Sequence, residues 1–163
     1  MEPTMVDLDE MMVVGMQTLT SSKYNVIPHL WDRIIPRRKE IKNIANDEIG
    51  LGISFGMEEI VEEDGEKVNI FYHLGGVPVK SIEHIPEGMT YRKIPAHTYA
   101  RFTHKGLISR LGDTYKYIYN EWLPHSDYDY DCAGVEIEWY DERFKGRDSE
   151  SSEFDILIPI KKK

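Results

Sequence analysis

Short stretches of apolar or alternating apolar and polar residues recur along the chain, which is the pattern of β-strands. They cover residues 12–16, 51–56, 68–80, 91–105, 134–140 and 154–160. Two longer stretches, residues 25–44 and 107–123, instead repeat apolar residues at offsets of three and four, the period of an amphipathic helix. Pro36 predicts a bend or break in the first helix, and Pro124 predicts the end of the second.

The order of these elements is strand-helix-strand-strand, and it occurs twice. Gly52 and Gly134 occupy corresponding places, so the halves repeat at about 82 residues. We therefore predict an α+β fold of two such units related by pseudo-two-fold symmetry, with an antiparallel sheet and two main helices that flank a ligand groove. The expected organisation is a single domain over residues 1–163, with half-repeats at about 5–82 and 88–163.

Several local features carry further expectations. Asn25 is expected to cap the first helix, with Pro28 in its first turn. Gly75 and Gly76 predict a bulge or a bend in their strand. The remaining polar stretches predict an acidic lead-in over residues 1–10, loops over residues 58–66, 126–131 and 141–153, and a turn at Asp64 and Gly65.

Composition and charge exclude several classes of protein. The chain has 163 residues with 20 basic and 29 acidic side chains, a net charge of −9 that disfavours general binding to nucleic acid. Cys132 is the one cysteine, so no internal disulfide forms. No apolar stretch reaches the roughly 18 residues of a membrane helix, and residues 1–10 lack the features of a signal peptide, so a cytoplasmic location without a membrane partner is expected.

A carboxylate inside an aromatic-rich strand is the strongest chemical feature. Glu136, Glu138 and Tyr140 share one face of the strand over residues 134–140. If that face looks into a groove, partial burial raises the pKa of Glu138, and the carboxylate attracts flat, hydrophobic cations with help from aromatic faces. If the face looks into solvent, Glu138 is an ordinary surface residue, and alternation alone favours this second interpretation.

Four stretches of the chain resemble the gyrase-inhibitor-like (GyrI-like) family, which is also the effector-binding domain of AraC-type and multidrug-responsive transcription regulators. They are residues 94–106 (IPAHTYARFTHKG), 121–126 (EWLPHS), 137–144 (IEWYDERF) and 156–160 (ILIPI), in the order found in the family. The resemblance spans nearly the whole chain and implies a duplicated fold with a ligand groove between its halves. The chain has no room for the helix-turn-helix of the regulators, which indicates a stand-alone member without direct DNA binding.

The resemblance also implies the site residues. Glu138 corresponds to the pocket acid of the family, the glutamate two residues before the strand's tyrosine. The remaining predicted ligand-binding residues are aromatic or small polar ones: Tyr140, Tyr72, Trp31, Tyr115, Tyr119 and Ser54. No metal and no cofactor are expected, because the six histidines are scattered without ligand spacing.

Three functions follow from these features. The first is a binding protein for hydrophobic or cationic aromatic small molecules, acting as a sensor or a sequestering resistance factor. The second, which the resemblance implies because some stand-alone members are similar to such enzymes, is a hydrolase of strained-ring (cyclopropane-containing) natural products, in which Glu138 activates water and Tyr72 donates a proton to the leaving group. The third, taken from the family name, is a protein inhibitor of a DNA-processing enzyme, which would give the chain a protein partner.

Overall fold

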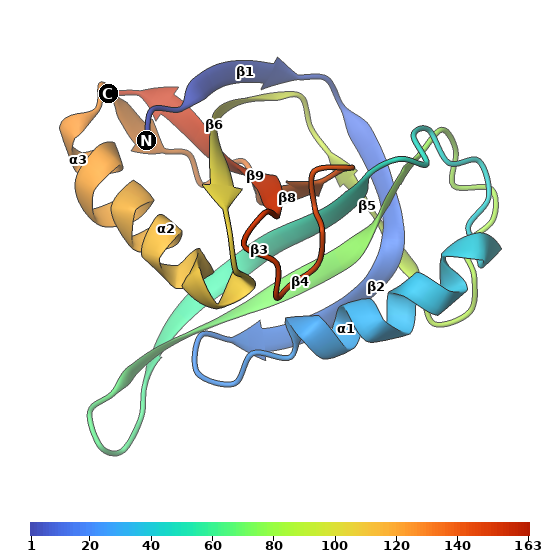
Figure 1. Cartoon of the computed structure of the whole chain (residues 1–163), viewed down its shortest axis with the longest axis horizontal. Coiled ribbons are helices and arrows are strands. Elements are labelled where there is room, and N and C mark those ends of the chain that lie inside the picture. The colour runs from blue at the N-terminus through green and yellow to red at the C-terminus, as the bar shows by residue number, and fades with distance from the viewer. The chain divides into compact units, whose positions relative to one another are not determined.

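The computed structural model describes residues 1–163, and its contacts divide the chain into two compact units (Figure 1). The N-terminal unit is Met11–Ile94, and the C-terminal unit combines Met1–Glu10 with Pro95–Lys163. No helix in either unit is long and apolar enough to cross a membrane. The boundary between the units falls at Pro95, inside a stretch that the alternation pattern assigned to a single strand.

The N-terminal unit is a four-stranded antiparallel sheet with one helix. Its strands are β2 (Met11–Ser21), β3 (Gly50–Val61), β4 (Lys67–Val79) and β5 (Thr90–Ile94), in the order β3-β4-β2-β5. Helix α1 (Ile27–Ile34) buries Leu30 and Ile34 against Met16 of β2, which places the predicted apolar face on the sheet.

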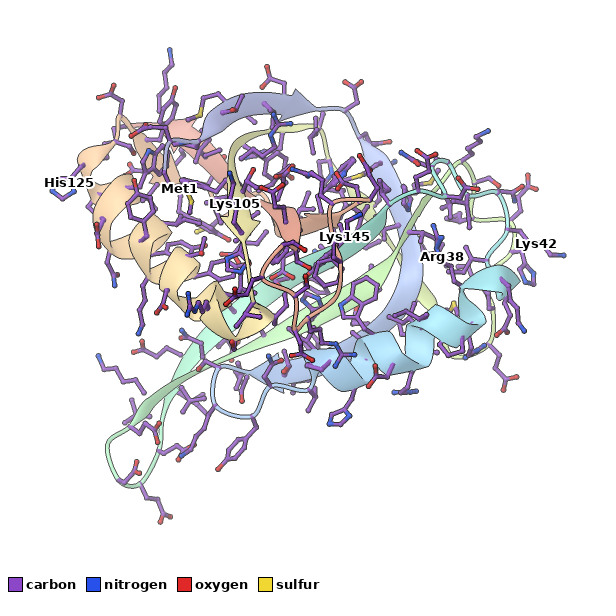
Figure 2. All side chains as sticks on the ribbon, viewed as in Figure 1. Met1, Arg38, Lys42, Lys105, His125 and Lys145 are labelled. Atoms are coloured by element: carbon purple, nitrogen blue, oxygen red, sulfur yellow. The ribbon has the colours of Figure 1, made fainter.

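The proline in the first helix acts as predicted. Helix α1 ends at Ile34, and the chain continues as the 3-10 helix η1 (Ile35–Glu40), because Pro36 cannot donate a backbone hydrogen bond. Arg38 of η1 donates to the carbonyl oxygens of Asp47 (2.6 Å) and Ile49 (3.3 Å) and holds the turn to the following segment (Figure 2).

The start of α1 differs from the prediction. Pro28 lies in the first turn, as expected, but the N-cap residue is Val26. The Asn25 side chain lies one residue earlier and accepts a hydrogen bond from the Ile27 amide at 3.0 Å. Asn25 therefore supports the turn before the helix rather than capping it.

Gly75 and Gly76 of β4 allow strands β2 and β4 to approach each other closely, and the predicted bulge there is wrong. Strands β2 and β4 pair in unbroken register through Gly15 and Gly76. A Cβ atom built on Gly15 would lie 1.9 Å from the Gly75 carbonyl oxygen, and one on Gly76 would lie 2.1 Å from the Val14 carbonyl oxygen. The register shift instead lies in β3 between Phe55 and Glu58.

The acidic stretch 58–66 is a loop only in its second half. Glu58 to Val61 continue strand β3, exposed on both faces, so the prediction of a loop is wrong there. The turn at Asp64 and Gly65 is confirmed, with Gly65 at φ 84° and its amide bonded to the Glu62 carbonyl oxygen at 2.9 Å.

The C-terminal unit is a second antiparallel sheet, in the order β1-β6-β9-β8. Its strands are β1 (Thr4–Leu8), β6 (His97–Lys105), β8 (Glu136–Tyr140) and β9 (Glu153–Lys162), and the short β7 (Tyr128–Tyr130) also pairs with β9. Three predictions are corrected here: residues 1–10 contain β1, residues 126–131 contain β7, and residues 91–105 form two strands that end and begin around Pro95.

One helical segment covers this sheet. It consists of the 3-10 helix η2 (Ile108–Arg110), α2 (Leu111–Tyr117), the π-helical turn η3 (Ile118–Trp122) and α3 (Leu123–His125). It ends one residue beyond Pro124, which occupies the first turn of α3. Lys105 ends β6 just before this segment (Figure 2). The core beneath the segment contains Ala100, Phe102, Ile118, Phe154, Ile156, Ile158 and Ile160.

The predicted order of elements is confirmed in both units. The N-terminal unit reads β2-α1-β3-β4, and the C-terminal unit reads β6-α2-β8-β9, with β5, β1 and β7 as additional strands. The loop after β8 is less solvated than predicted. Phe144 packs against the core, and Arg143 binds both Asp141 and Asp155.

Candidate functional site

Glu138 lies on the covered face of the C-terminal sheet. Its backbone pairs with Ile156 of β9, and its side chain is 8% exposed. Because α2 covers this face, the solvent-facing interpretation of Glu138 is wrong. A carboxylate this buried needs hydrogen-bond donors or a positive charge close by.

Two tyrosine hydroxyls supply those donors. Tyr115 of α2 donates to Glu138 Oε1 at 2.9 Å, and Tyr140 of β8 donates to Oε2 at 2.6 Å. Burial raises the pKa of both tyrosines well above the ordinary value, and the charge of Glu138 adds to this, so both stay protonated donors. Each oxygen of Glu138 thus has one fixed partner, and no positively charged side chain is bonded to either.

Aromatic rings surround the carboxylate. Tyr140 stacks on Phe154 with ring centroids 4.6 Å apart and meets Phe144 edge-on at 5.0 Å. Tyr115 stacks on Tyr119 at 6.4 Å with nearly parallel rings. The predicted residues Glu138, Tyr115, Tyr119 and Tyr140 therefore form one cluster in the C-terminal unit.

A second carboxylate, Glu136, belongs to the same cluster and was not among the predicted site residues. Tyr119 donates a hydrogen bond to its Oε1. Burial raises the pKa of Glu136 to about 7; the hydrogen bond from Tyr119 opposes this shift and the charge of Glu138 adds to it. The pKa of Tyr130 is also raised, mainly by burial and then by the charge of Glu136. The Tyr130 ring packs against that of Tyr119, with ring centroids 6.2 Å apart. At neutral pH the cluster thus holds one carboxylate close to its titration point.

The raised pKa of Glu136 predicts that stability falls as pH rises. Between the ordinary glutamate value near 4.5 and the folded value of about 7, the folded state binds more protons than the unfolded state. The free energy of unfolding of the wild type should therefore fall on the order of 3 kcal/mol relative to Glu136→Gln between about pH 5 and about pH 8. Urea denaturation of both proteins across this range measures the difference, and parallel pH profiles would contradict the assignment.

The other predicted site residues lie in the N-terminal unit. Ser54 Oγ is 2.8 Å from His73 Nδ1, and Tyr72 is 42% exposed with its ring stacked on Phe55 at 5.6 Å. Trp31 packs beside Leu30 and Ile34, with its ring against Gly75 and Gly50. Their predicted contact with the ligand of Glu138 stays a prediction, as does the predicted groove.

Converging carboxylates occur at the β3–β4 turn. The acidic oxygens of Glu62, Asp64 and Glu66 lie within 4.8 Å of one another. Lys23 already binds Glu62 at 2.8 Å and Glu66 at 2.7 Å, so an ammonium group neutralises part of this charge. Asp64 and Glu66 are exposed and Glu62 is half-buried, so these residues at a hairpin tip do not form a buried ligand cage.

Comparison with known proteins gives one family and a set of similar structures. The model of the integron-associated effector binding protein family (Cass2) matches residues 4–160. The chain is 34% identical over 160 residues to the transcriptional regulator BrlR of Pseudomonas aeruginosa. That alignment covers 98% of the chain and 56% of BrlR, so the chain spans about half the length of this relative.

Solved structures share the fold at low sequence identity. The structure of SAV2435 bound to tetraphenylphosphonium matches with a TM-score of 0.69 and 16% identity, over 99% of this chain and 94% of that one. An integron cassette protein from the mobile metagenome of Vibrio cholerae matches with a TM-score of 0.65 and 14% identity, over 98% and 96% of the two chains. These matches confirm the fold class predicted from the order of elements.

Proposed function

The chain belongs to the family of integron-associated effector-binding proteins, and on that premise we propose that it binds hydrophobic, cationic aromatic small molecules. The observation that carries the proposal is the buried Glu138 carboxylate, which is held by tyrosine hydroxyls and has no positively charged side chain bonded to it. A ligand cation would supply the missing charge.

The surroundings of Glu138 suit such a ligand. The rings of Tyr115, Tyr119 and Tyr140 border the carboxylates, and each cation–π contact contributes about 0.5–2 kcal/mol. Glu136 adds a second carboxylate, and a bound cation favours its ionised form. The solved structure of SAV2435, which shares this fold, contains tetraphenylphosphonium, a ligand of this chemical class.

Binding is favoured over catalysis by the way Glu138 is held. The hydrogen bonds from Tyr115 and Tyr140 fix both oxygens of Glu138 toward tyrosine hydroxyls, whereas a general base must direct an oxygen at a water molecule. We therefore propose a sensor or sequestering protein. The net charge of −9 disfavours direct binding to duplex DNA.

A charge-inverted pair of ligands tests the proposal. Tetraphenylphosphonium and tetraphenylborate have nearly the same shape and apolar area but opposite charge. Isothermal titration calorimetry should show binding of the phosphonium at least about tenfold tighter than binding of the borate, which is the scale of one charged contact. Equal affinity for both ions would contradict a carboxylate site, and tighter binding of the borate would overturn it.

A further inference from the structure

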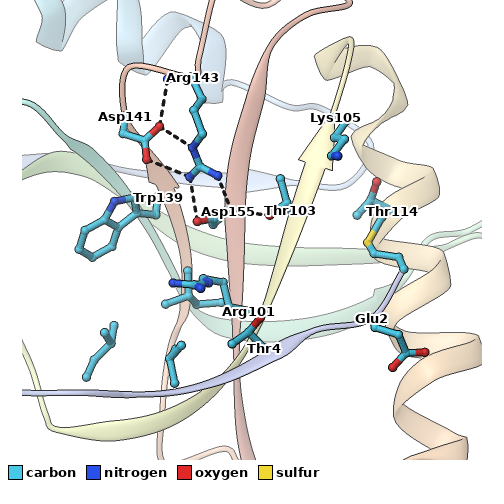
Figure 3. Close-up of a pocket in the computed structure, with 14 residues that line it drawn as sticks. Glu2, Thr4, Arg101, Thr103, Lys105, Thr114, Trp139, Asp141, Arg143 and Asp155 are labelled. Carbon is cyan, nitrogen blue, oxygen red and sulfur yellow. Dashed lines mark hydrogen bonds and ion pairs between the residues drawn. The ribbon is translucent and has the colours of Figure 1, made fainter.

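The C-terminal unit contains a cavity that is separate from the Glu138 cluster. Adjacent residues of a strand point to opposite faces, and the cavity is lined by Trp139, the neighbour of Glu138. Alternate residues of β1, β6 and β9 form its walls (Figure 3). Its volume is about 800 Å³, within the range of roughly 300–1,000 Å³ that small-molecule sites occupy.

One part of the wall is apolar. It is formed by Val6 and Leu8 of β1, Leu157 of β9 and the indole of Trp139. Leu157 is 2% exposed and the other three are half-buried, so these side chains are held in place by their neighbours. A flat aromatic body that covered them would be removed from water together with the indole ring.

Two of the three acidic side chains that line the cavity, Asp141 and Asp155, are already neutralised in part by an arginine, and the third, Glu2, is exposed. The Arg143 guanidinium bonds to both oxygens of Asp141 (2.8 and 2.9 Å) and to both oxygens of Asp155 (3.2 and 2.8 Å). The Thr103 hydroxyl also donates to Asp155 at 2.8 Å. These side chains are hydrogen-bonded to one another, so they form a fixed polar wall rather than a site for a ligand charge.

Arg101 is different: it is an exposed residue that lines the cavity, and its guanidinium has no hydrogen bond and no ion pair in the structure. Its backbone pairs with Thr4 of β1 and with Leu157 of β9, which sets it between polar and apolar parts of the wall. Figure 3 shows its side chain extending across the cavity toward the side on which Trp139 lies. A free guanidinium presents a planar fork of donors that fits a carboxylate.

We propose that this cavity is a second ligand site, which binds a flat aromatic carboxylate through Arg101 and the apolar wall of Val6, Leu8, Trp139 and Leu157. The ligand has the opposite charge to the one proposed for Glu138, and the two sites lie on opposite faces of one sheet. The second site does not depend on the first.

Naphthalene-2-carboxylate is the probe for the test, with 2-naphthylmethylammonium and 2-naphthalenemethanol as cationic and neutral counterparts. In two-dimensional NMR of the labelled protein, the carboxylate should shift the Trp139 indole signal and the amides of β1 and β6. Its Kd should rise roughly three- to tenfold in Arg101→Met, which keeps a side chain of similar length and removes the charge of a partly solvated contact. Arg101→Lys, which keeps the charge without the fork, should give an intermediate Kd and serves if the first variant folds poorly.

The matched control is Arg110→Met, an exposed arginine of the same unit that does not line the cavity. It should leave the Kd of the carboxylate unchanged, and Arg101→Met should leave binding of tetraphenylphosphonium unchanged. The proposal is overturned if naphthalene-2-carboxylate causes no shifts at millimolar concentration or if the shifts surround Glu138 instead. It is also overturned if Arg101→Met and Arg110→Met bind the carboxylate equally, or if the ammonium counterpart binds this cavity more tightly than the carboxylate.

Discussion

Replacing Gly15 with alanine is expected to destabilise the N-terminal unit by about 3 kcal/mol or more. The added Cβ atom would lie 1.9 Å from the Gly75 carbonyl oxygen and 2.6 Å from the Gly76 Cα atom. Both are backbone atoms within the register of β2 and β4, so no side chain can rotate to relieve the contact. The two strands would have to separate where their hydrogen bonds hold the sheet together. Denaturation by urea, followed by circular dichroism, measures the loss.

Gly112 supplies the matched control. It lies in helix α2, and a Cβ atom built there meets nothing within 4 Å. Gly112→Ala should therefore raise the free energy of unfolding by roughly 0.5–1 kcal/mol, the gain of alanine over glycine in a helix. If Gly15→Ala unfolds at the same urea concentration as the wild type, the close approach of β2 and β4 is wrong.

The sequence alone predicts the helices and strands that bury one apolar face, and it misses the strands that have few buried side chains. Strand β1 is mostly exposed, with Thr4, Met5 and Asp7 on the surface, so its pattern is not distinguishable from a polar lead-in. Strand β7 is three residues long and is held by pairing with β9. Both strands depend on partners far away in the chain, which a local pattern does not contain.

The break at Pro95 has a similar cause. Alternation continues on both sides of the proline, so the pattern reads as one strand over residues 91–105. The structure assigns Thr90–Ile94 to one unit and His97–Lys105 to the other. Proline rarely lies inside a strand, because it lacks the amide that the ladder needs, and this rule would have found the break.

The alternation of β8 places Glu136 and Glu138 on one face but does not reveal which face is covered. That depends on the packing of α2, which brings two tyrosines onto two glutamates. The spacing holds a signal for Glu136. Tyr115 and Tyr119 are four residues apart on a helix, a rise of about 6 Å. Glu136 and Glu138 are two residues apart on a strand, a rise of about 6.8 Å. Because the two spacings are similar, a helix that places Tyr115 on Glu138 also places Tyr119 on Glu136.

Glu138→Gln is expected to weaken binding of tetraphenylphosphonium by roughly 1.5–3 kcal/mol, the scale for losing a contact with a charged group. Glutamine keeps the shape of the side chain, its carbonyl oxygen accepts from one tyrosine hydroxyl and its amide group donates to the oxygen of the other, so the loss reports mainly the charge. An uncharged aromatic ligand of similar size should bind both proteins about equally, since it gains nothing from the carboxylate. Turnover of a strained-ring electrophile that disappears in Glu138→Gln while binding persists would favour the hydrolase instead.

The most direct test of the account compares Glu138→Gln with Glu142→Gln by calorimetric titration of tetraphenylphosphonium. Glu142 lies exposed in the loop after β8, four residues from Glu138, and carries the same charge. We predict that the Glu138 variant loses roughly ten- to 100-fold in affinity, whereas the Glu142 variant loses less than about 1 kcal/mol, as an exposed carboxylate does. Equal losses in the two variants would show that net charge attracts the cation and would contradict the assignment of Glu138 as the buried, ligand-selecting carboxylate.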